Sequence, residues 1–164
     1  MHEHIGAITA MSFWLMKSEP TEVSVDDVLA EPDQTAPWFG IRNYQARNFM
    51  RDAMRIGDGV FFYHSSCANP GIVGIAEVAS TPYPDPTQFD RSSHYFDPKA
   101  SLENPRWVMV DVRVLRKVSL IPIAQLRAEE DLADMQVLQR GNRLSISRVS
   151  AAEWRCIIQR LISK

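Results

Sequence analysis

The sequence has few cysteines, no long apolar run and little net charge, and each shortage excludes a class of protein. Its two cysteines, Cys67 and Cys156, belong to no motif, so nothing in the sequence needs a disulfide framework or an oxidising compartment. We expect Cys156 to be a buried free thiol on an amphipathic helix. No apolar run approaches the roughly 18 residues that cross a bilayer, and we expect a cytoplasmic protein with no membrane contact. A formal net charge of −2 excludes a polycation that grips nucleic acid everywhere.

The first ten residues, MHEHIGAITA, lack the basic start and continuous apolar stretch of a signal peptide. We interpret residues 1–11 as a tail, from an upstream start codon or added residues, with Met11 the more natural start. The rest, 12–164, is expected to form one domain, because the chain of 164 residues is 45% hydrophobic and 23% charged. That size and composition are those of one globular unit with a real core.

The signatures of common enzymes are also missing. The sequence has no phosphate loop, no dinucleotide fingerprint, no His-Glu-x-x-His and no Gly-x-Ser-x-Gly. His2 and His4 lie in the tail, and neither His64 nor His94 has metal-ligand spacing to a cysteine, so we expect no metal and no cofactor. His64-Ser65-Ser66-Cys67 is either a polar floor for a ligand or simple turn chemistry, because adjacent strand residues point to opposite faces and His64 cannot easily activate Ser65.

Charge is unevenly distributed along the chain. Residues 19–33 carry six acidic residues and no Lys or Arg, whereas residues 42–55 carry four arginines against Asp52 alone. Segments 113–117 and 140–148 add further basic residues. A nearly neutral protein with basic stripes can bind a phosphate backbone locally, although each arginine is equally consistent with ordinary solvated surface charge.

Apolar periodicity and turn signals predict an α+β fold. Strands are expected at 12–17, 60–64, 72–79, 107–115 and 144–148, and helices at a short segment after Ser24, at 43–55, within 121–139 and from Ser150 to the end. Asn43 is predicted to cap the second helix, and Ser150 with Glu153 to form a capping box on the last. Residues 80–105 hold five prolines and are predicted to be a long surface excursion. About five or six strands with glycines where they bend suggest a small curled sheet or barrel flanked by helices.

The stretch from Trp38 to Tyr44 is the most suggestive of function. Trp38 offers a stacking face, Arg42 a phosphate partner, and the following helix N-terminus free N–H donors, which are three things that a base-binding site needs. The alternative is that Trp38 and Tyr44 simply pack the helix on the sheet, which is the commoner role of such residues.

Taken in order, several separate motifs resemble the EVE domain family, the relatives of thymocyte nuclear protein within the PUA-like superfamily. The resemblance covers Phe13 to about Leu161. Its landmarks are Trp14-Leu15-Met16-Lys17-Ser18-Glu19-Pro20, Trp38-Phe39-Gly40-Ile41-Arg42-Asn43-Tyr44-Gln45-Ala46-Arg47-Asn48, Gly57-Asp58, Phe62-Tyr63-His64-Ser65, Gly71-Ile72-Val73-Gly74, Tyr95-Phe96-Asp97-Pro98-Lys99, Arg143-Leu144-Ser145 and Glu153-Trp154. One departure is Ser147-Arg148, where the family usually has Gln-Pro, which implies a more basic edge of the cleft.

The resemblance implies a PUA-like β-barrel wrapped by helices, with a pocket for a modified base, such as a modified cytosine or adenine, in DNA or RNA. The pocket residues implied are Lys17, Ser18, Trp38, Gly40, Ile41, Asn43, Tyr44, Tyr63, His64, Ser65, Arg143, Leu144 and Ser145. The phosphate contacts expected beside them are Arg42, Arg47, Arg51 and Arg148. No nucleophile or metal is needed for such a reader, whose partner is nucleic acid carrying a modified base.

Two other functions remain open from the sequence. One is a small hydrolase acting on a modified nucleoside or on RNA, as in the related ASCH fold, with Lys17, Glu19 or His64 as acid–base groups. The other is an interaction module whose pocket takes some other small aromatic ligand. The sequence leaves the modification, the choice between DNA and RNA, and the oligomeric state undetermined.

Overall fold

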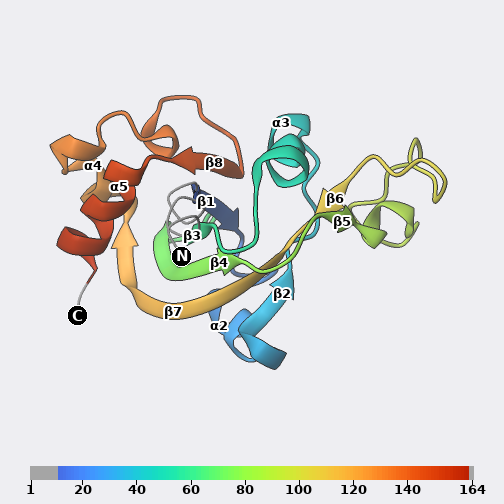
Figure 1. Ribbon diagram of the computed structural model, residues 1–164, viewed down its shortest axis with the longest axis horizontal. Helices are drawn as coiled ribbons and strands as arrows, with labels where there is room; N and C mark the ends of the chain where they lie inside the picture. Colours follow the sequence, from blue (N-terminus) through green and yellow to red (C-terminus); the bar gives the residue numbers. More distant parts are fainter. Residues whose placement is uncertain (1–10, 163–164) are drawn as a thin grey trace, which may run out of the picture.

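The computed structural model of the protein describes residues 11–162, so all but the last residue of the expected tail lies outside the described residues. Figure 1 shows a curved sheet with helices on both sides and an arm that extends from it. The strands are β1 Phe13–Ser18, β2 Thr35–Pro37, β3 Gly59–His64, β4 Gly71–Val78, β5 Tyr83–Pro84, β6 Val108–Met109, β7 Asp111–Pro122 and β8 Ile146–Val149. The helices are α2 Val25–Leu29, α3 Tyr44–Asn48, α4 Ile123–Arg127 and α5 Ala151–Cys156, with π turns at Phe49–Ala53 and Ile157–Leu161 and 3-10 turns at Pro32–Gln34, Pro86–Phe89, Glu130–Leu132 and Gln136–Leu138.

Six of the strands form one mixed sheet in the order β2-β7-β4-β3-β1-β8. β1 and β3 run parallel, with Ser18 opposite His64 at their carboxyl ends, and every other neighbouring pair is antiparallel. The register of β4 against β7 shifts between Ile72 and Gly74. The long β7 bends along its whole length (Figure 1), so the sheet is strongly curled. Because β2 and β8 are its two edges, the sheet is not closed, and a full barrel stays a prediction.

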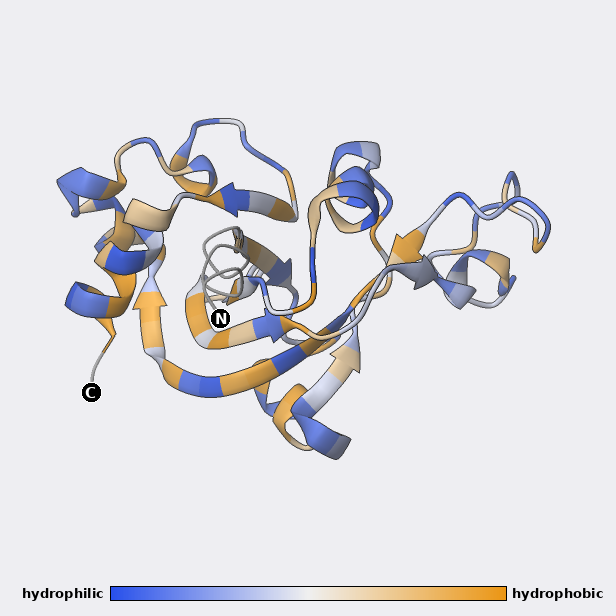
Figure 2. Cartoon of the chain, viewed as in Figure 1, coloured by the Kyte–Doolittle hydropathy of each residue, from blue (hydrophilic) through white to orange (hydrophobic). Residues whose placement is uncertain are grey.

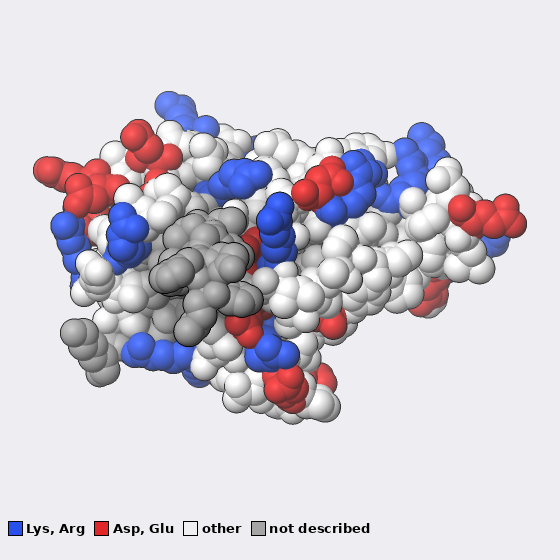
Figure 3. All heavy atoms as spheres, viewed as in Figure 1, with Lys and Arg blue, Asp and Glu red and all other residues white. Residues whose placement is uncertain are grey.

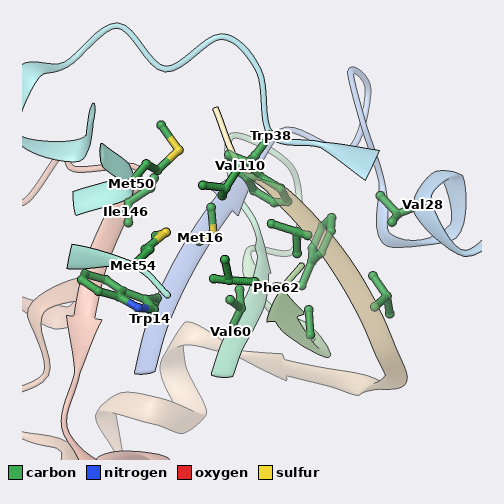
Figure 4. Close-up of a cluster of buried hydrophobic side chains, with 14 of the residues drawn as sticks. Trp14, Met16, Val28, Trp38, Met50, Met54, Val60, Phe62, Val110 and Ile146 are labelled. Carbon is green, nitrogen blue, oxygen red and sulfur yellow. The ribbon is translucent and has the colours of Figure 1, made fainter. Parts of the chain in front are cut away.

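The central strands are buried on both faces because their side chains alternate between two cores. Trp14 of β1 and Phe62 of β3 belong to a cluster that includes residues of α2 and α3, part of which is drawn in Figure 4. Leu15 and Phe61, the residues next to them, belong to a second cluster that includes residues of α4 and α5. In the hydropathy colouring of Figure 2, apolar residues also extend along the neighbouring strands β4 and β7. Such a doubly buried sheet gives the strand ends a rigid base.

The predicted helix starts are confirmed, but the helix expected over 43–55 is shorter. Asn43 accepts a hydrogen bond from the Ala46 N–H, and Ser150 with Glu153 forms the capping box. After Asn48 the backbone continues as a π turn in which the Met54 N–H bonds to the Phe49 carbonyl, and Met54 itself is extended. The periodic stripe still meets the core, because Ala46, Met50 and Met54 are all buried.

Sequence periodicity missed two features of the strands. β2 was not predicted, because three residues are too few to show a pattern. β7 extends to Pro122, whereas the sequence predicted an end at Leu115. The prediction stopped too early because the second half of β7 exposes both polar and apolar residues, so the alternation typical of a strand is lost there. The proline-rich segment is the arm at the side of the sheet in Figure 1, held at its base by β5 and β6.

Cys156 is a buried free thiol, as predicted. Within residues 11–162, no helix has the length and apolarity that crossing a membrane requires.

Candidate functional site

A cavity of about 490 Å³ lies where the two edges of the curled sheet approach the end of β1. Lys17 and Ser18 come from β1, Ser65 and Ser66 follow β3, and Arg143 and Ser145 precede the edge strand β8. The opposite side is formed by the other edge strand, β2, and by the loop Trp38–Arg42 that follows it. Its size is within the range of small-ligand pockets. The remaining lining residues are Glu19, Glu22, Val23, Val28, Ala36, Pro37, His94, Tyr95 and Val112.

Trp38 is a wall of this cavity and a core residue at the same time. Its side chain is 7% exposed, and its ring meets Phe62 edge-on, with centroids 5.1 Å apart. Figure 4 shows it at the rim of the buried cluster, beside Val110. Trp38 therefore offers the cavity a narrow surface rather than a free ring face, and the half-buried rings of Phe39 and Tyr95 supply the rest of the aromatic lining.

A buried carboxylate fixes the loop that carries Trp38. Asp85, whose side chain has no exposed surface, accepts hydrogen bonds from the Gly40 N–H at 2.7 Å and from Arg42 Nη1 at 3.2 Å. The same carboxylate also accepts from the backbone and hydroxyl of Thr87. Arg42 donates in addition to Thr87 and to the carbonyls of Ile41 and Tyr95. We call residues Trp38–Arg42 the cavity loop. Arg42, Asp85 and Thr87 are called the clasp, since they tie this loop to the base of the arm.

The arm closes over the loop at Gly40. A Cβ on Gly40, whose φ is +85°, would lie 2.8 Å from the Tyr95 ring, so only glycine allows this approach. The Tyr95 hydroxyl donates to both carboxylate oxygens of Glu22, at 2.6 and 2.8 Å. Burial and the hydrogen bond to Glu22 raise the pKa of Tyr95, which keeps the hydroxyl protonated as a donor. One side of the cavity is thus fixed by a chain of contacts from Glu22 through Tyr95 to Gly40.

The cavity combines both signs of charge with hydroxyl groups. Burial lowers the pKa of Lys17, whose ammonium lies 5.9 Å from the centre of the Tyr63 ring and has no carboxylate in ion-pair distance within residues 11–162. Arg143 is exposed at the mouth. Glu19 and Glu22 face the same space. Such a lining can accept and donate hydrogen bonds around a planar polar ligand, while the described residues contain no cluster of His, Cys, Asp and Glu suited to a metal ion.

Eight of the predicted pocket residues lie together around this cavity: Lys17, Ser18, Trp38, Gly40, Ile41, Ser65, Arg143 and Ser145. The other five do not line it. His64 Nε2 accepts a hydrogen bond from the Val25 N–H at 3.1 Å, and burial lowers the pKa of His64, so the neutral ring holds the first turn of α2. Asn43 caps α3 and Tyr63 lies in the second core. Leu144 lies between the lining residues Arg143 and Ser145 but does not itself line the cavity.

Tyr44 and the predicted phosphate contacts are distributed over three places. All five N–H donors of Arg42 already have acceptors in the clasp and its neighbours, so a phosphate would have to displace one of them. Tyr44, Arg47 and Arg51 lie on the outer side of α3 and the π turn. Arg148 lies 4.7 Å over the Trp14 ring, away from the cavity lining. The basic edge of the cleft expected from Arg148 is therefore not found, because β8 points this side chain elsewhere.

Sequence reasoning missed Glu22, Asp85 and Tyr95 as parts of the site. Tyr95 did stand among the family motifs, but Glu22 and Asp85 looked like ordinary loop acids. Their roles depend on contacts between segments 43 to 73 residues apart, which no local pattern reveals.

The EVE domain family model matches residues 12–160. The chain belongs to the EVE domain family. It is 46% identical over 127 residues to human thymocyte nuclear protein 1, a match that spans 71% of this chain and 56% of the human protein. The zebrafish (Danio rerio) thymocyte nuclear protein 1 is 41% identical over 165 residues, covering 90% of this chain and 71% of that protein. The chain therefore spans little more than half of the human relative.

Solved structures agree with the family. The crystal structure of human THYN1 in complex with DNA containing 5-methylcytosine has a TM-score of 0.85 at 40% identity, over 90% of this chain and 95% of that chain. A Pseudomonas putida protein has the same TM-score at 43% identity, over 90% of this chain and 97% of that chain. A Zymomonas mobilis ASCH protein, 12% identical with a TM-score of 0.55, over 93% of this chain and 99% of that chain, shows likeness of fold alone.

Proposed function

We propose that this protein is a nucleic-acid reader that holds a modified base, of which 5-methylcytosine is the first candidate, in the cavity between β1, the cavity loop and Ser145. The observation that carries the proposal is the cavity itself, which gathers aromatic, cationic, anionic and hydroxyl groups on a rigid sheet end. The THYN1 structure with DNA containing 5-methylcytosine supports the choice of ligand.

The lining suits a flipped base. A base needs acceptors for its exocyclic amine, donors for its ring nitrogen and carbonyl, and apolar contact for its faces. Glu19 and Glu22 can accept, Lys17 and the hydroxyls of Ser65, Ser66 and Ser145 can donate, and the aromatic walls give the contact. The Ser18 hydroxyl already donates to the Val23 carbonyl at 2.6 Å. No step of this binding calls for a nucleophile.

The test compares two duplexes that differ by one methyl group on cytosine, and the matching pair of RNA strands. We expect tighter binding of a modified strand, and we expect Arg143→Gln and Lys17→Met to weaken it while Arg155→Gln, an exposed change on α5, does not. Equal affinity of the wild-type protein for the modified and unmodified members of both pairs would refute the reader.

The hydrolase alternative is checked in the same samples. Modified nucleosides and oligonucleotides incubated with the protein are expected to be recovered unchanged by mass spectrometry. Turnover that disappears in Lys17→Met would replace binding with catalysis as the function.

We also propose that the sheet is a PUA-like barrel left open between β2 and β8, and that the protein acts in the cytoplasm.

A further inference from the structure

A cluster of arginine and aromatic side chains lies outside the cavity, where α3 meets residues 106–107. Tyr44 is 45% exposed and stacks on Trp107, with centroids 4.8 Å apart and ring planes 24° apart. The guanidinium carbons of Arg47 and Arg106 lie 4.6 and 5.7 Å from the Tyr44 ring centre, and Arg106 also donates to the Tyr44 hydroxyl. We call Tyr44, Arg47, Arg51 and Arg106 the Tyr44 patch. Figure 3 shows basic side chains gathered on this face of the molecule, over the region of α3 and β6 in Figure 1.

The cations of this patch are only partly compensated. Arg51 pairs with Asp52 at 2.9 Å, and both are exposed, while Arg106 lies 3.6 Å from Asp97. Arg47 has no carboxylate in ion-pair distance within residues 11–162, and donates instead to the amide oxygen of Asn48 and to a backbone carbonyl. Burial and the positive charges of Arg51 and Arg106 lower the pKa of Arg47. The charges of Arg51 and Arg106 therefore disfavour the charge of Arg47, and an anion bound between these groups would relieve that repulsion.

The patch is joined to the cavity by Arg42. This side chain lines the cavity, and its guanidinium carbon lies 5.4 Å from the centre of the Trp107 ring on which Tyr44 stacks. Asp85 in the clasp holds Arg42 in place. A strand whose base enters the cavity would thus have this patch within reach of its neighbouring backbone.

We propose that the Tyr44 patch binds the sugar–phosphate backbone beside the base that enters the cavity. The inference rests on the proposed function. Guanidinium groups bind phosphate oxygens through paired N–H donors. The Tyr44 ring, which stacks on Trp107 and has the Arg47 guanidinium over it, holds these cations together. Of the four phosphate contacts expected from the sequence, the patch keeps Arg47 and Arg51 and leaves out Arg42 and Arg148, and it adds Arg106 from the arm.

The test is the salt dependence of binding to a duplex that contains one 5-methylcytosine. Each lost phosphate contact should reduce the slope of log affinity against log salt by about 0.9. We expect a reduction of about one contact in Arg51→Gln, whose exposed side chain can be changed without disturbing the core, and of about two in the Arg51→Gln, Arg106→Gln double variant. The double lysine variant, Arg51→Lys with Arg106→Lys, should keep the slope. All three should keep the wild-type preference for the methylated duplex.

The controls separate this inference from the proposed function. Arg155→Gln removes an exposed arginine from α5, on the other core, and should leave the slope unchanged. A wild-type slope in Arg51→Gln would overturn the patch while a retained methyl preference left the reader intact. A second outcome would also overturn the inference. If the wild-type protein bound a soluble poly-glutamate peptide and Arg51→Gln lost that binding while it bound DNA as the wild type does, the patch would be assigned to an acidic protein partner. If the wild-type protein itself showed no preference for the methylated duplex, the proposed reader function would be refuted instead.

Discussion

Replacing Asp85 with asparagine should loosen the cavity loop more than any other change of similar size. The carboxylate has no exposed surface and accepts hydrogen bonds from Gly40, Arg42 and Thr87. Asparagine keeps the volume but removes the charge and one acceptor, and its own amide donors would face groups that already donate. The Arg42 guanidinium, whose side chain is 21% exposed, would lose its counter-charge.

The size of the effect follows from the loss of a buried pair. Removing one partner of such a pair costs about 3–5 kcal/mol. Arg42 keeps its bonds to the carbonyls of Ile41 and Tyr95, so we take the lower end, about 3 kcal/mol of unfolding free energy. In a chain of this length each kcal/mol shifts the Tm by about 2–4 °C, which predicts a drop of about 6–12 °C.

Thermal unfolding of Asp85→Asn, followed by circular dichroism, measures this drop, and duplex binding measured below the transition should weaken as well. Asp90→Asn is the matched control, because Asp90 lies on the same arm and is exposed, and its carboxylate bonds only to Ser92 among residues 11–162. The Tm of this control should change by less than about 2 °C. If Asp85→Asn unfolds within that margin of the wild type, the clasp does not hold the loop and the reasoning fails.

Three further changes test other parts of the site. Because burial lowers the pKa of His64, the folded protein binds the proton of this residue less readily than the unfolded chain, so stability should fall as the pH drops below about 6.5. In His64→Gln, whose amide oxygen can still accept from the Val25 N–H, the Tm difference between about pH 7.5 and 5.5 should shrink. An unchanged difference would assign the pH dependence to other groups. Gly40→Ala forces a side chain into a left-handed backbone against Tyr95 and should cost at least about 1–2 kcal/mol, seen as a lower urea midpoint, whereas a wild-type midpoint would show that the arm moves freely. Lys17→Met removes a half-buried cation that has no ion-pair partner within residues 11–162, and it should raise the Tm while weakening duplex binding; a lower Tm would mean that the ammonium stabilises the fold.

The parts of the fold that the sequence predicted are those determined by neighbours along the chain. Ser24, Asn43 and Ser150 begin helices because a side-chain oxygen and a backbone N–H three residues later are enough to do so. The strand Val60–His64 was clear because its run of β-branched and aromatic residues leaves no polar alternation to confuse it. The π turn after Asn48 was not predicted, because its i→i+5 bonds keep the apolar residues facing the core and hide the change in helix type.

The site was predicted where motif residues end a strand and missed where distant loops meet. Lys17 and Ser65 follow from β1 and β3 running parallel to one common end. His64, next to Ser65, was placed in the same pocket, but strand alternation turns its ring toward α2. Asp85 lies in a proline-rich excursion whose folding back on Gly40 has no local signature.

The open sheet and the cavity have one origin. In a closed barrel the first and last strands would share hydrogen bonds, and the space between them would be filled by backbone. Here the two edges, β2 and β8, each contribute residues or immediate neighbours to the same cavity: Ala36 and Pro37 on one side, Ser145 on the other. The exposed-edge hazard of such strands is reduced because the edges are only three and four residues long. The cavity in which we propose that a base binds is therefore the gap that leaves the sheet unclosed, and a relative that paired these edges would lose the cavity.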